Sequence, residues 1–206
     1  MNNNCPGAAP AYFQLRDYRP LEPGDWISQN AATGTISHFV TQLAPMSGVR
    51  VISVIRDRGT ADELARAKRS LQSHGAALVL THDGLRTTTA LAGKRIVVAV
   101  DSVADDALAQ DMAARLISGG TLVTAGFLGV PSGGAIALGK RSATQQTALI
   151  EWLAELLTRG VLTAPALEYV HWKQGEAGLK QRLKESIRSD GQGAVGERKK
   201  ILVFDR

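Results

Sequence analysis

The chain has 206 residues, of which 44% are hydrophobic and 21% charged, with a formal net charge of +5. This composition is typical of a globular protein, and the length fits one compact domain with an appendage better than two full domains. A single cysteine excludes a disulfide framework and a cysteine-ligated metal cluster, and the four histidines show no metal-ligand spacing, so we expect no metal site.

The first residues bear on where the protein works. The opening sequence, MNNNCPGAAP, lacks the apolar core of a signal peptide and the arginines of a transit peptide. No run of about 18 apolar residues occurs, so no membrane span is expected. Either the protein is made where it works, or the sequence begins late.

Hydrophobic patterning predicts helices and strands in regular alternation. In chain order the predicted elements are a helix at 11–17, a strand at 26–29, a helix at 35–43, a strand at 49–55, a helix at 60–74, a strand at 77–80, a helical turn at 84–91, a strand at 95–100, a helix at 104–116, a strand at 121–125, a helix at 144–158, a strand at 166–171, a helix at 176–189, a loop at 191–196 and a strand at 201–204. Strands that alternate with helices of about 10 to 15 residues predict an α/β fold, a doubly wound parallel sheet of Rossmann-like type with a C-terminal strand-helix-strand appendage. We therefore divide the chain into a lead-in helix (1–20), a dinucleotide-binding domain (21–160) and a basic appendage (161–206).

The segment from Asp25 to Arg58 is the most informative part of the sequence. A short apolar strand leads through a small-residue turn and an amphipathic helix to a second apolar strand with a basic end, which is the order of a dinucleotide-binding βαβ unit. The right-handed crossover rule places the turn at the carboxyl edge of the central strand, where nucleotides bind. Arg56 and Arg58 follow the second strand, where a guanidinium can pair with the 2′-phosphate of NADPH; a solvated Arg-Asp-Arg turn is the alternative.

Six short motifs, in order over most of the chain, carry a family resemblance. They are PAY (10–12), LEPGDW (21–26), QNA (29–31), VIRDR (54–58), GGTLVT (119–124) and GVLTAP (160–165). With them the chain resembles the mitochondrial 2-enoyl thioester reductases (trans-2-enoyl-CoA/ACP reductases) of the medium-chain dehydrogenase/reductase superfamily. The resemblance implies NADPH-dependent reduction of the 2,3 double bond of enoyl thioesters, in mitochondrial fatty-acid synthesis, and a mitochondrial location.

The turn and the resemblance together indicate which residues bind the cofactor. These are Asn30, Thr33, Gly34, Thr35, Ile36, Arg56, Arg58, Ala125, Gly126 and Phe127. No catalytic residue is predicted, because the family takes its catalytic tyrosine from an N-terminal domain without a counterpart in this sequence. Tyr12, Tyr18 and Tyr169 do not match the motif of that tyrosine.

The small-residue turn departs from the family pattern. The family runs Asn-Ser-Gly/Ala-Val-Gly, whereas residues 33–37 are Thr-Gly-Thr-Ile-Ser. Ser37 adds a side chain where the last glycine lets the helix pack closely on the strand, so we expect NADPH binding to be weak or lost. The alternative is an ordinary turn in which Thr33 or Thr35 caps the helix.

The segment after the fourth strand also departs from the pattern. The family has Asn-Cys-Val-Gly-Gly, whereas residues 101–105 are DSVAD. Asp101 and Asp105 therefore put negative charge at the carboxyl edge, where uncompensated charge opposes an anionic cofactor.

Three functional hypotheses remain open. The favoured one is a pseudoenzyme, an enoyl reductase-like fold kept as a structural or accessory subunit of a larger mitochondrial complex. The second is the nucleotide-binding half of a split NADPH-dependent reductase, with the catalytic domain on another chain. The third is an RNA-contacting, ribosome-associated protein that uses the basic region Lys173–Arg206, for which a solvated surface is the simpler interpretation.

Overall fold

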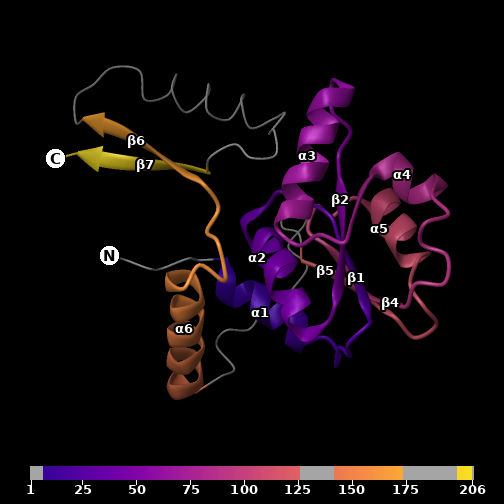
Figure 1. Ribbon diagram of the computed structural model, residues 1–206, viewed down its shortest axis with the longest axis horizontal. Helices are drawn as coiled ribbons and strands as arrows, with labels where there is room; N and C mark the ends of the chain where they lie inside the picture. The colour runs from indigo at the N-terminus through magenta and orange to yellow at the C-terminus, as the bar shows by residue number, and fades with distance from the viewer. Residues whose placement is uncertain (1–6, 126–141, 174–198, 206) are drawn as a thin grey trace. The chain divides into compact units, whose positions relative to one another are not determined.

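The computed structural model describes residues 7–125, 142–173 and 199–205 (Figure 1). The chain falls into two compact units, Met1–Asp57 with Leu71–Ala164, and Arg58–Ser70 with Pro165–Arg206.

The first unit is built on a five-stranded parallel sheet in the order β3-β2-β1-β4-β5. Its strands are β1 (Trp26–Gln29), β2 (Arg50–Ile55), β3 (Leu78–Thr81), β4 (Ile96–Asp101) and β5 (Thr121–Thr124). The chain moves outward from β1 to β3 and then returns to the other side of β1 for β4 and β5. This confirms the predicted doubly wound sheet, with its topological switch point between β1 and β4.

Helices cover both faces of this sheet. The helices that cover it are α1 (Ala8–Arg16), α2 (Thr35–Leu43), the short 3-10 helix η1 (Ala44–Ser47), α4 (His82–Thr87), α5 (Asp106–Ala113) and α6 (Ala143–Thr158). A further helix, α3 (Ala61–Ser73), includes residues of both units. One apolar cluster joins the sheet to α1, α2 and α6, and a second joins its opposite face to α4 and α5, which Figure 1 shows on the other side of β1 from α2. Because both faces are covered, residues 51–55 and 96–101 are buried without interruption.

The helix starts show where local sequence rules hold. Thr60 precedes α3 and accepts a hydrogen bond from the Glu63 N–H at 3.2 Å, as an N-capping threonine does. The predicted capping of α2 by Thr33 or Thr35 is wrong, because Gly34 is the N-cap and no side chain caps this helix.

The LEPGDW motif forms a turn at the amino edge of the sheet. Gly24 has φ 94°, a conformation that favours glycine. The buried Asp25 carboxylate accepts a hydrogen bond from the Glu22 N–H at 2.9 Å and lies 2.9 Å from Nε of Arg95. The turn before β1 is thereby fixed to the residue before β4.

The second unit contains a parallel pair of strands, β6 (Leu167–Lys173) and β7 (Lys199–Asp205), which pair from Leu167↔Lys199 to Lys173↔Asp205. Both were predicted as strands. The predicted helix at 176–189 and loop at 191–196 lie outside the described residues. None of the described helices is long and apolar enough to cross a membrane.

Candidate functional site

The carboxyl ends of β1 and β4 are joined by a buried side-chain contact. The Asn30 amide donates to Oδ1 of Asp101 at 2.5 Å, and its oxygen accepts from the Ser102 N–H at 2.6 Å. Both side chains are at most 1% exposed. Asn30, predicted to bind the cofactor, therefore uses both polar ends of its side chain to close the gap between the two strands at the switch point.

Asp101 is the centre of this contact. Besides the Asn30 amide, its Oδ1 accepts the N–H groups of Val103 at 3.0 Å and Ala104 at 3.1 Å. All three donors are neutral, and no lysine or arginine among the described residues forms an ion pair with Asp101. The carboxylate is thus well hydrogen-bonded, but its negative charge has no cation beside it in this part of the structure.

Asp105, the other acidic residue predicted at this edge, is exposed and has a local role. Its carboxylate accepts the Leu108 N–H at 2.9 Å and so caps α5. An exposed charge is screened by water and salt much more than a buried one. Of the two carboxylates, Asp101 therefore exerts the stronger electrostatic effect on a nearby charge.

Two residues at this edge have strained backbones. Ala31 has φ 46° and Ala104 has φ 60°, and they are the non-glycine residues with positive φ in the part of the chain that the structure describes. One follows β1 and the other precedes α5, so both lie in loops beside the switch point. Such strain costs on the order of 1 kcal/mol each and gathers at functional sites.

The start of α2 is suited to an anion. Gly34 is its N-cap, no side chain accepts the first N–H groups, and the Gly34 N–H is itself bonded to the Ala31 carbonyl at 2.7 Å. A Cβ built on Gly34 would lie 3.0 Å from that carbonyl oxygen, so the turn is tight. Free N–H groups and the helix dipole together favour a phosphate at this position.

The two side chains that depart from the family's turn both point into the protein. The Thr35 side chain lies against Gly7 at the start of α1, where a Cβ on the glycine would be 2.6 Å from the Thr35 Cγ2. Ser37 is 5% exposed, and its hydroxyl lies 3.5 Å from the Asn30 carbonyl oxygen, between α2 and β1. Neither side chain therefore fills the space in front of the helix start.

The remaining predicted residues are distributed as follows. Thr33 and Ile36 are partly exposed at the start of α2, and Arg56 is exposed directly after β2. Arg58 belongs to the second compact unit, where it is partly exposed. Ala125 follows β5 and donates its N–H to the Asp101 carbonyl at 2.7 Å, while Gly126 and Phe127 lie outside the described residues. Within the first unit the structure thus brings the α2 start, Arg56 and Ala125 to one edge of the sheet.

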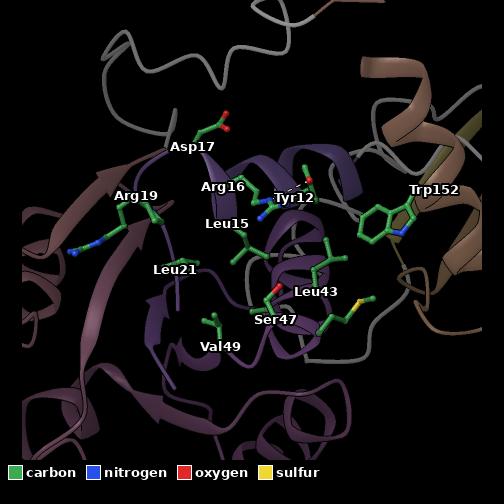
Figure 2. A pocket seen from close by; sticks show the side chains of 13 residues that line it. Tyr12, Leu15, Arg16, Asp17, Arg19, Leu21, Leu43, Ser47, Val49 and Trp152 are labelled. Atoms are coloured by element: carbon green, nitrogen blue, oxygen red, sulfur yellow. Dashed lines mark hydrogen bonds between the residues drawn. The ribbon is translucent and has the colours of Figure 1, made fainter. Parts of the chain in front are cut away.

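A cavity of about 830 Å³ lies at the opposite, amino edge of the sheet (Figure 2). Leu21 and Val49, which come just before β1 and β2, form part of its lining, and Tyr12 of α1 meets Trp152 of α6 with ring centroids 5.6 Å apart. Because nucleotides bind at the carboxyl edge of such sheets, this cavity is separate from the candidate site. No sequence pattern predicted this cavity, because the residues that line it come from distant segments of the chain.

The structure also bears on other chemistry at the surface of this unit. No group of three or more histidine, cysteine, aspartate or glutamate side chains among the described residues is placed to hold a metal ion. Beside α1, burial and the nearby charge of Asp17 raise the pKa of the Tyr18 hydroxyl above its ordinary value. Tyr18 is therefore a neutral phenol at physiological pH.

Similarity to known proteins agrees with this geometry. The chain is 30% identical over 203 residues to the mitochondrial enoyl-[acyl-carrier-protein] reductase of Homo sapiens, a match that covers 87% of this chain and 53% of the human enzyme. The corresponding enzyme of Rattus norvegicus is 38% identical over 76 residues, which cover 37% of this chain and 20% of that enzyme. The chain is homologous to part of the mitochondrial enoyl-[acyl-carrier-protein] reductases. This confirms the resemblance found in the motifs, although no protein-family model matches the chain.

Solved structures show the same fold. The Etr1p/NADP/crotonyl-CoA complex superposes with a TM-score of 0.74 at 21% identity, over 97% of this chain and 60% of that one. A thermostable alcohol dehydrogenase from Pyrobaculum aerophilum superposes with a TM-score of 0.61 at 22% identity, over 97% of this chain and 55% of that one. The chain thus spans about half the length of the human relative and of these structures, and the match covers almost all of the chain.

Proposed function

We propose that this protein is a mitochondrial, enoyl reductase-like domain that binds NADP(H) at the carboxyl edge of its sheet. The observation that carries the proposal is the start of α2, which lies at the switch point with no side chain on its first N–H groups. Arg56, exposed at the end of the neighbouring strand β2, supplies a cation on the adenosine side. The homology to mitochondrial enoyl-[acyl-carrier-protein] reductases and the fold shared with an NADP complex support it.

The residues present fit the cofactor. The N–H groups of Thr35 and Ile36 would hold the pyrophosphate, because Gly34 leaves the backbone free to come close to it. Arg56 would hold the 2′-phosphate that distinguishes NADPH from NADH. The role of Arg58, which belongs to the second unit, stays a prediction from the sequence. The bound cofactor supplies hydride chemistry, and the protein's own part is to bind and orient it.

Binding of the intact chain to NADPH and NADH, measured by isothermal titration calorimetry, tests this proposal. Arg56→Ala and Arg58→Ala are each expected to weaken NADPH binding by about 10- to 100-fold, which is the usual contribution of a hydrogen bond between charged groups. NADH binding should change little, because NADH lacks the 2′-phosphate. Arg50→Ala is the matched control, because Arg50 is exposed at the opposite end of the same strand. No binding of NADPH by the wild-type protein at millimolar concentration would refute the proposal.

For the protein's role in the cell, we propose a structural or accessory subunit of a larger mitochondrial assembly. Several large apolar side chains of the first unit are exposed, among them Met46 at 49%, Ile150 at 57% and Val161 at 47%. Exposed apolar groups of this size favour a protein partner. Purification of the tagged protein from mitochondria should recover defined subunits in fixed ratio, and recovery of the protein alone would count against this role.

The nucleotide-binding half of a split reductase is the second candidate, supported by the fold that the chain shares with the Etr1p/NADP/crotonyl-CoA complex. It predicts that NADPH-dependent reduction of an enoyl thioester appears when the purified partner is added, and that Arg56→Ala lowers this activity. Inactivity of the purified pair would favour the accessory role. RNA contact through Lys173–Arg206 stays a separate proposal, tested by salt-dependent RNA binding.

A further inference from the structure

We propose that Asp101 makes this site prefer the oxidised cofactor, NADP⁺, over NADPH. The inference rests on the proposed binding of NADP(H) and goes beyond it, since it assigns a residue that sets the preference between the two redox states. It starts from a buried carboxylate at the switch point whose hydrogen-bond donors, among the described residues, are all neutral.

Asp101 ends β4, on the side of the switch point where the nicotinamide half of the cofactor would lie. In a sheet of this order the two halves of a dinucleotide lie on either side of the switch point. Arg56 follows β2, on the adenosine side of β1, whereas Asp101 ends β4 on the other side. The Asp101 carbonyl also accepts the Ala125 N–H at 2.7 Å, which binds the end of β5 to the same place.

Electrostatics then distinguishes the two redox states. The nicotinamide ring is positively charged in NADP⁺ and neutral in NADPH, while the phosphates are the same in both. Asp101 is 1% exposed, so water and salt screen its charge poorly. The three N–H groups orient the carboxylate without cancelling its charge. The carboxylate therefore attracts the positively charged ring of NADP⁺ and has no comparable attraction for the neutral ring of NADPH.

The expected size follows from Coulomb's law. At an effective dielectric constant of about 20, unit charges up to about 12 Å apart change a binding constant roughly tenfold or more. Asp101→Asn removes the charge and retains an oxygen that can accept the same three N–H groups. It is therefore expected to shift the ratio of the two dissociation constants by roughly tenfold toward NADPH.

The experiment measures the dissociation constants of NADP⁺ and NADPH by calorimetry on the intact wild-type chain and on Asp101→Asn. Asp105→Asn is the matched control, since it removes the same charge from an exposed residue at the same edge while an asparagine still caps α5. A shift of less than about twofold is expected there, because the exposed charge is screened. Arg56→Ala is expected to weaken both cofactors equally and leave their ratio unchanged.

The outcomes separate the inference from the proposed function. Binding of both cofactors to Asp101→Asn with an unchanged ratio would overturn the inference and leave the proposed function intact. An equal shift in Asp105→Asn would also overturn it. Failure of the wild-type protein to bind either cofactor would refute both. Circular dichroism checks the fold of each variant, and Asp101→Ser, which also removes the charge and keeps an acceptor oxygen, replaces Asp101→Asn if that variant does not fold.

Discussion

Two helices begin beside the switch point of the sheet, and they begin in opposite ways. Among the described residues, no side chain accepts a hydrogen bond from the first N–H groups of α2, the helix that follows β1. At the start of α5, after β4, the Leu108 N–H donates to the Asp105 carboxylate, and in the loop before it the Val103 and Ala104 N–H groups donate to Asp101. Both helices point their positive ends toward the same edge.

The difference shows which side of the edge is open to an anion. On the β4 side the protein supplies its own carboxylates, so the N–H groups are already satisfied. On the β1 side the backbone donors are left for a ligand, and Arg56 adds a cation nearby. The geometry therefore favours phosphate binding at α2 and a different, charge-sensing role beside β4.

Asp101→Ala should have the largest effect, because it removes the hydrogen-bond acceptor at the end of β4. It leaves the Asn30 amide and two backbone N–H groups without their acceptor in a buried place. We expect the free energy of unfolding to fall by about 3 kcal/mol, measured by denaturation in urea. A loss below about 1 kcal/mol would show that this contact does not hold the two strands together.

Gly34→Asp should make the start of α2 resemble the start of α5. The new carboxylate would accept the first N–H groups and occupy the place proposed for the pyrophosphate. NADPH affinity is expected to fall by tenfold or more, about 1.4 kcal/mol, in a calorimetric titration. Gly34→Asn, which caps without charge, serves as the control and should cost less affinity, so equal losses would contradict a charge effect.

Asp105→Ala should remove only the cap of α5. The free energy of unfolding is expected to fall by about 1 kcal/mol, the usual value for an N-cap. NADPH affinity should change by less than about twofold, because water and salt screen the charge of this exposed carboxylate. Thermal unfolding and a calorimetric titration of the same sample measure the stability and the NADPH affinity. A large change in NADPH affinity would contradict the difference proposed between the starts of α2 and α5.

Ser37→Gly should have the smallest effect, although it restores the glycine of the dinucleotide fingerprint. The Ser37 side chain lies between α2 and β1 and not in front of the helix start. Helix propensity alone predicts a loss of about 0.5 kcal/mol in stability, with NADPH affinity unchanged. A clear gain in NADPH affinity would show that this serine does obstruct the cofactor.

Local sequence patterns predicted most of the helices and strands, but they did not predict the contacts between them. The strand Trp26–Gln29 and the helix Thr35–Leu43 were predicted with these same ends, because apolar periodicity marks both. The predicted capping of α2 by Thr33 or Thr35 was wrong. Both are good capping residue types, but the turn is held by Gly34 and by packing against α1. The contact of Asn30 with Asp101 spans 71 residues and has no local signal.

By itself the sequence determined the alternation of strands and helices, the position of the turn between the first strand and the helix after it, and the family from which the fold comes. Those features follow from short-range periodicity, from the handedness of βαβ crossovers and from motifs a few residues long. Only the tertiary structure decided that α2 begins without a cap, that Ser37 faces the strand and that Asp101 is buried against Asn30. The physical reason is that burial and hydrogen-bond partners depend on which distant segments the sheet brings side by side.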